Sequence, residues 1–85
     1  MSKILIIEDE EAIRRVLAKI LREENESYEV DVAEDGVIGF EKIKENDYDL
    51  VLCDIKMPKM DGVELLEAVK KIDTEIPIVM ISGHG

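Results

Sequence analysis

Short apolar runs alternate with longer amphipathic segments along the whole chain, and this alternation limits the possible fold more than any other feature. The apolar runs have the length and composition of strands, at residues 3–8, 28–33, 49–53 and 78–81. The segments between them have the spacing of amphipathic helices, at residues 10–24, 35–45 and 62–72. We expect Asp9 to cap the first helix, Asp35 to open the second, and Asp61 with Glu64 to form a capping box at the third. The apolar stripe of the first helix is expected to comprise Ile13, Val16, Leu17, Ile20 and Leu21. Strands and helices that alternate through short connections predict a parallel sheet with helices on both faces.

The order of the strands follows from the handedness of the connections. Right-handed crossovers leave two common doubly wound arrangements. In the flavodoxin-like order, 2-1-3-4, the strands at 3–8 and 49–53 are neighbours, and their carboxyl ends flank the point where such folds bind ligands. We therefore expect one α/β domain over residues 1–85, with three layers and a parallel sheet in the order 2-1-3-4.

Acidic residues follow the two strands that this order makes neighbours. Glu8 and Asp9 come after the first apolar run, and Asp54 comes after the third. Three like charges at one edge of a sheet repel one another, and carboxylate oxygens are the ligands that Mg2+ prefers. The pattern predicts a magnesium site in which one carboxylate could act as a nucleophile. The alternatives are that Glu8 and Asp9 only favour the start of a helix, and that Asp54 is a turn residue.

The charge and the apolar content exclude several classes of function. A net charge of −10 would be repelled by phosphate backbones and anionic membranes, so we expect no nucleic-acid or membrane partner. No apolar run has the length of a membrane span or of a signal peptide core. The single cysteine, Cys53, is expected to be a small buried apolar residue, which is consistent with a reducing cytoplasm. No nucleophile elbow or cofactor loop is present, so we do not expect an independent enzyme.

Four motifs match those of a known family. They are Ile6-Ile7-Glu8-Asp9-Glu10, Asp35-Gly36, the stretch from Asp54 to Gly62 (DIKMPKMDG) and the stretch from Pro77 to Gly83 (PIVMISG). On these motifs the chain resembles the receiver domain of bacterial two-component response regulators, CheY-like proteins of the flavodoxin-like fold, over all 85 residues. The ending Ile-Ser-Gly-His-Gly is most similar to receivers of sigma-54-dependent activators.

The resemblance implies a phosphorelay role and a set of Mg2+ ligands. Asp54 would accept a phosphoryl group from a sensor histidine kinase. Asp9 would hold Mg2+ directly and Glu8 through water, while Asp54 and the backbone carbonyl of Lys56 would complete the protein ligands.

The resemblance also assigns roles beside the acceptor. Ser82 matches the switch hydroxyl that turns toward the phosphoryl group, and Pro58 and Gly62 match residues that shape the adjoining loop. The alternative for Ser82 is a small polar residue that ends a strand. His84, between two glycines, is expected to be a flexible tail residue rather than a ligand.

The chain departs from the family pattern at its carboxyl end. A complete receiver has five strands and five helices, so we expect this chain to lack the last helix, strand and helix. The lysine and the aromatic residue of the fifth strand have no counterpart, since Lys56 and Lys59 lie in a different loop. The alternative function is therefore an engineered or excised half-domain that serves only as a homodimeric scaffold, without phosphotransfer.

The same departure predicts a homodimer. The strand at 78–81 would be an edge without polar alternation, and the sheet face beside the first helix would be uncovered. We expect two copies to cover each other through this strand and this face, with or without exchange of segments. Val37 and Ile38 make the first turn of the second helix unusually apolar, either as extra core or as a second contact surface.

Overall fold

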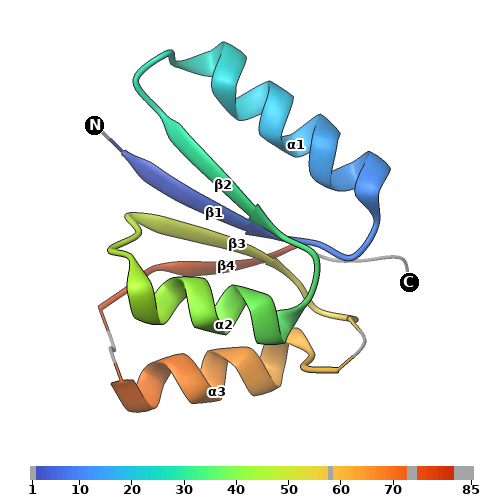
Figure 1. Ribbon diagram of the computed structural model, residues 1–85, viewed down its shortest axis with the longest axis vertical. Helices are drawn as coiled ribbons and strands as arrows, with labels where there is room; N and C mark the ends of the chain where they lie inside the picture. The colour runs from blue at the N-terminus through green and yellow to red at the C-terminus, as the bar shows by residue number, and fades with distance from the viewer. Residues whose placement is uncertain (1, 58, 73–74, 82–85) are drawn as a thin grey trace.

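One parallel sheet lies between two helical layers (Figure 1). The computed structural model describes residues 2–57, 59–72 and 75–81. The elements in chain order are β1 Lys3–Ile7, α1 Glu11–Glu24, β2 Glu29–Ala33, α2 Gly36–Glu45, β3 Leu50–Asp54, α3 Gly62–Ile72 and β4 Ile78–Ile81. The strand order is β2-β1-β3-β4, with every pair parallel. The predicted three-layer α/β fold and strand order are confirmed.

The two helical layers cover different faces of the sheet. Figure 1 shows α1 on one side and α2 and α3 on the other. Strand residues alternate between these faces. The α2 and α3 side holds the larger core, which includes Leu5, Ile7, Val51, Cys53, Leu65 and Val69. The α1 side holds a smaller core of Ile6, Ala18 and Val30. The central strands are thus buried on both faces, as a parallel sheet requires.

The helix α3 starts with the predicted capping box. The backbone N–H of Glu64 donates to Asp61 Oδ1 at 2.9 Å, and the backbone N–H of Asp61 donates to Glu64 Oε1 at 3.4 Å. These two bonds satisfy backbone donors that the first turn of a helix leaves free. Local sequence chemistry is therefore sufficient to place this helix start.

The start of α1 differs from the prediction. We expected Asp9 to cap this helix, but the N-cap residue is Glu10, whose side chain makes no capping hydrogen bond. Asp9 is exposed, and its carboxylate lies close to those of Glu8 and Asp54 instead. The prediction is wrong because the acidic side chain is directed to the end of the sheet rather than to the helix backbone.

Only part of the predicted apolar stripe on α1 is buried. Leu17 and Leu21 pack against the smaller core, whereas Val16 and Ile20 remain 56% and 55% exposed. The helix packs against β1 and β2, so its flank toward β3 and β4 has no cover among the described residues. The predicted helix is confirmed, but Val16 and Ile20, which were expected on its buried stripe, are exposed.

The other predicted contact surfaces can now be placed. Among the described strands β4 pairs with β3 alone and forms an edge, and its Val79 is 50% exposed. In α2, Val37 is exposed but Ile38 packs against the larger core. Ile38 thus fits the alternative of extra core packing, and a contact surface at Val37 stays a prediction. None of the helices in the described ranges has the length and apolar character to cross a bilayer.

Candidate metal centre

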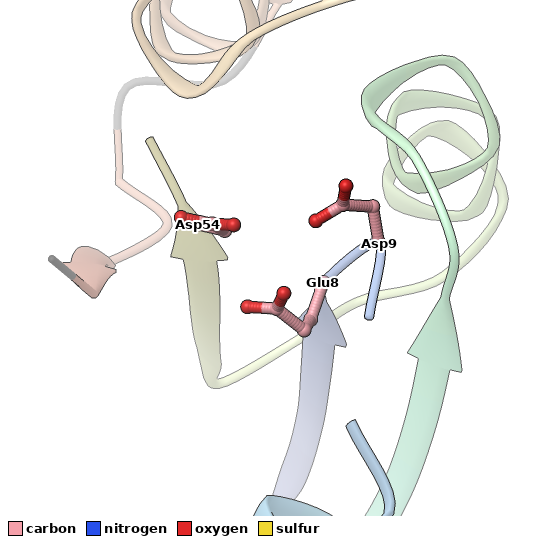
Figure 2. Close-up of side chains that lie close together, drawn as sticks. All are labelled: Glu8, Asp9 and Asp54. Atoms are coloured by element: carbon pink, nitrogen blue, oxygen red, sulfur yellow. The ribbon is translucent and has the colours of Figure 1, made fainter. Parts of the chain in front are cut away.

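Three carboxylates from two neighbouring strands meet at one end of the sheet. Glu8 and Asp9 follow β1 directly, and Asp54 is the last residue of β3. Because Ile7 pairs with Cys53 in a parallel ladder, the residues that follow emerge side by side. Oxygen atoms of the three carboxylates all lie within 4.8 Å of one another. Figure 2 shows the three side chains directed toward a common space.

Two of these carboxylates are buried. Glu8 is 2% exposed and Asp54 is 1% exposed, whereas Asp9 is open to solvent. Burial raises the pKa of Glu8 above its usual value, and the charges of Asp54 and Asp9 raise it further. The backbone N–H of Glu10 donates to Glu8 Oε1 at 3.2 Å and opposes part of this rise in pKa. The centre therefore holds negative charge where water screens it poorly.

One oxygen of the cluster has no hydrogen-bond donor within the described ranges. Asp54 Oδ1 is fully buried and has no hydrogen-bond donor among the residues that the structure describes. A buried polar oxygen without a donor is unfavourable, so the position is better suited to a ligand than to a structural role. This orphaned oxygen lies in the cluster that also contains Glu8 and Asp9.

No basic side chain neutralises the cluster in the described part of the chain. The ion pairs there involve Glu11, Glu23, Asp35 and Glu41, and none includes the three clustered acids. Arg14 comes near, but its guanidinium donates to the backbone carbonyl of Glu8 at 2.8 Å. A set of carboxylate oxygens with uncompensated charge fits Mg2+, which takes oxygen ligands and retains several waters.

A tight loop follows Asp54. The backbone N–H of Gly62 donates to the carbonyl of Ile55 at 2.8 Å, and a Cβ on Gly62 would lie 2.7 Å from the carbonyl oxygen of Asp54. A larger residue at Gly62 would therefore push α3 away from the end of β3. Lys56 is exposed in this loop, and its role as a backbone ligand stays a prediction. Pro58 lies outside the described residues.

Sequence reasoning missed one contact beside the centre. Asp35 was expected only to open α2, and its Oδ1 does accept the backbone N–H of Ile38 at 2.8 Å. Its Oδ2, however, lies 3.4 Å from Nζ of Lys59 in the loop after β3. The Ile38 N–H and the charge of Lys59 hold the pKa of Asp35 below its usual value, although burial opposes them. No local sequence signal links two residues so far apart in the chain.

The remaining candidates lie beside or outside the cluster. Cys53 is fully buried, and burial, together with the charges of Asp54 and Glu8, raises the pKa of its thiol to about 12. It stays protonated at neutral pH and acts as a core residue, as expected. Ser82 and His84 lie outside the described residues.

Comparison with known sequences identifies relatives along the whole chain. A family model described as the response regulator receiver domain matches residues 4–85. The response regulator ArlR of Staphylococcus saprophyticus is 40% identical over 85 residues, which cover 100% of this chain and 37% of ArlR. The chemotaxis protein CheY of Halobacterium salinarum is 41% identical over 84 residues, which cover 99% of this chain and 68% of CheY.

Solved structures share the fold. The response regulator TrrA of Thermotoga maritima, crystallised in complex with Mg2+-BeF, matches with a TM-score of 0.92 at 35% identity, over 100% of this chain and 72% of TrrA. A complex of TrrA with the histidine kinase ThkA matches with a TM-score of 0.90 at 35% identity and the same coverage. The chain thus spans little more than a third of ArlR and about two thirds of CheY.

Proposed function

This chain belongs to the family of response regulator receiver domains, and from that premise we propose that it accepts a phosphoryl group on Asp54 from a sensor histidine kinase, with Mg2+ bound at the acidic cluster. The observation that carries the proposal is the buried, unpartnered Oδ1 of Asp54 next to the carboxylates of Glu8 and Asp9. The complexes of TrrA with Mg2+-BeF and with the kinase ThkA support the same reaction class.

In this proposal each acid has a separate task. Asp9 and Glu8 hold the cation, Glu8 through water, and Asp54 with the backbone carbonyl of Lys56 completes the protein ligands. Mg2+ would neutralise charge on the carboxylates and on the transferring phosphoryl group. A carboxylate oxygen of Asp54 attacks phosphorus, the P–N bond to the kinase histidine breaks, and the histidine nitrogen keeps the bonding electron pair. The product is an aspartyl phosphate and a free kinase histidine.

The proposal makes the chain a signalling module rather than a classical enzyme. In this role Asp54 is itself modified by the phosphoryl group that the kinase supplies, and the chain does not turn over a separate substrate. Ser82 would supply the hydroxyl that turns toward the phosphoryl group after transfer. The reaction would take place in the cytoplasm.

The first prediction tests phosphoryl transfer to Asp54. Incubation of the chain with acetyl phosphate and Mg2+ is expected to add the mass of one phosphoryl group, measured by intact-mass spectrometry. The modification should be lost on treatment with hydroxylamine, because an acyl phosphate is labile to nucleophiles. Asp54→Asn is expected to stay unmodified, as is the wild-type chain in excess EDTA. An unmodified wild-type chain, or equal modification of the Asn variant, would sink the proposal.

A second candidate function is a homodimeric scaffold that performs no phosphotransfer. The observation that favours it is an apolar area on the α1 side of the sheet. The register pairs Leu52 with Val79, so both side chains lie on the face that carries α1. Val16 and Ile20 lie on the flank of α1 opposite the groove that Ala18 lines beside β2. This flank is thus directed toward β3 and β4.

The occupant of this area would be a second copy of the chain. Val16, Ile20 and Val79 are each half exposed or more, and β4, which carries Val79, is an edge of the sheet in the described part of the chain. Two copies related by a two-fold axis would bury both features at once. The scaffold and the phosphoryl acceptor are compatible, since the acidic cluster is at the end of the sheet and not on this face.

A further inference from the structure

Asp35 is one of only three charged side chains that are buried in the described part of the chain, and the other two belong to the acidic cluster. Both of its oxygens have partners. Oδ1 accepts the backbone N–H of Ile38 at 2.8 Å, which caps α2. Oδ2 accepts from Nζ of Lys59 at 3.4 Å, although the Lys59 side chain itself is largely exposed. The carboxylate thus joins the start of α2 to the loop that follows β3.

The backbone of the loop is pressed against α2 at the same place. Lys59 has a φ of 69°, and it is the only non-glycine residue with a positive φ in the described ranges. Such a conformation persists when surrounding contacts impose it. A Cβ on Gly36 would collide with the carbonyl oxygen of Met60, so no larger residue fits there. The Asp35–Lys59 ion pair and the close approach of Gly36 to Met60 together hold the loop at Lys59 and Met60 against the start of α2.

The same loop also carries Lys56, whose backbone carbonyl is a proposed Mg2+ ligand. The loop leaves β3 at Asp54 and passes through Lys56, and Gly62 N–H at its far end donates to the carbonyl of Ile55, the first residue after β3. Lys59 lies between these two points, only three residues after Lys56. Lys56 thus lies between two contacts, that of Gly62 with Ile55 and that of Lys59 with Asp35.

We propose that the Asp35–Lys59 ion pair positions the metal centre, by holding the loop in the conformation in which the backbone carbonyl of Lys56 reaches the cation. Neither residue belongs to the proposed ligand set, so both would be positioning residues. The inference rests on the proposed function for the identity of the ligand set. Removing the charge of either partner should therefore weaken Mg2+ binding while every carboxylate ligand remains in place.

The test compares Mg2+ affinity in matched variants by isothermal titration calorimetry. Lys59→Met keeps the length of the side chain, and Asp35→Asn keeps an N-cap oxygen, so each removes mainly the charge. Each is expected to weaken Mg2+ binding by about 5-fold to 10-fold, near the lower end for residues that orient ligands. Lys59→Arg should bind within about twofold of wild type, because Arg also pairs with a carboxylate. The double variant should lose no more than either single variant.

The control variant is Lys44→Met, which breaks the 2.9 Å ion pair with Glu41 on the surface of α2. It should leave Mg2+ affinity unchanged. In metal-free samples, the backbone amide NMR signals of Lys56 and Met57 should shift in Lys59→Met and not in Lys44→Met. The NMR readout needs no metal, so it reports on the loop even if the chain binds no cation.

Each outcome separates the explanations. Unchanged affinity in Lys59→Met overturns the positioning role while the proposed function stands. Weaker binding that tracks a fall in melting temperature and is not rescued by Lys59→Arg shows a purely structural role, which also overturns it. A wild-type chain that binds no Mg2+ overturns the ligand assignment itself. Weaker binding with an unchanged melting temperature, rescued by Arg, supports the inference.

Discussion

At the scale of the residue, three carboxylates of the same end of the sheet have different surroundings. Glu8 and Asp54 are almost fully buried, while Asp9 is exposed. Burial and the neighbouring charges raise the pKa of Glu8, which means that its ionised form is disfavoured in the folded chain. A site that gathers charge for a ligand lowers the stability of the ligand-free protein. The three acids should therefore lower the free energy of unfolding of the chain unless a cation is bound to them.

Replacing Glu8 tests this balance. Glu8→Gln is expected to stabilise the metal-free chain by about 1 kcal/mol at pH 7, because it removes one buried charge beside Asp54. Added Mg2+ should stabilise the wild-type chain but stabilise this variant much less. Urea unfolding with and without Mg2+ measures both effects, and the exposed Glu34→Gln serves as control. A Glu8→Gln chain that is less stable than wild type without metal would contradict the charge argument.

At the scale of the element, side-chain caps begin α2 and α3 but not α1. Asp35 caps α2 through the N–H of Ile38, and Asp61 and Glu64 form a reciprocal pair at α3. α2 packs closely on β1, since a Cβ on Gly39 would collide with the side chain of Ile7. α3, whose first residue Gly62 lies against the backbone of Asp54, therefore depends on its own first turn as well as on the core below it.

Removing the cap of α3 should lower stability. Asp61→Ala is expected to reduce the free energy of unfolding by about 1 kcal/mol, because the N–H of Glu64 loses its acceptor. Asp61→Asn should keep most of the stability, since Asn is an equally good cap. Urea denaturation of both variants measures the difference. Equal stability of the Ala and Asn variants would show that the capping bond contributes nothing measurable.

At the scale of the whole molecule, the two edges of the sheet are protected unequally. On β2 the backbone carbonyl of Val30 accepts from the guanidinium of Arg22 at 3.1 Å, so a long side chain covers part of that edge. β4 is the other edge, and its half-exposed Val79 lies on the same face as the uncovered flank of α1. An open edge beside an apolar face favours association with another chain.

The oligomeric state tests whether this edge and this apolar face form a dimer interface. The wild-type chain is expected to be a dimer at micromolar concentration by light scattering after size exclusion. Val16→Lys combined with Val79→Lys should shift it to monomer, because each buried lysine would lose hydration. Val37→Lys, on α2 at the opposite side of the sheet, is the control and should leave the dimer intact. A monomeric wild type contradicts the scaffold, and a dimer lost only in Val37→Lys moves the interface to α2.

Much of the fold was predictable because its signals are local. The period of apolar residues separates strands from helices, and a side chain three residues from a backbone N–H can cap it wherever the rest of the chain lies. The start of α3 at Asp61 and Glu64 is therefore readable from the sequence. The acids at the strand ends can likewise be identified from the local sequence. The direction of the Asp9 side chain cannot, because it depends on a strand about 45 residues away.

The sequence alone thus determined the elements, their order and the residues that carry the charge. The tertiary structure decided which of these residues meet: Glu8 with Asp54 through the pairing of β1 with β3, and Asp35 with Lys59 through the packing of α2 on the loop. It also decided that Val16 on α1 stays exposed. The physical reason is that burial, charge repulsion and ion pairing act through space, between residues whose separation along the chain gives no local pattern.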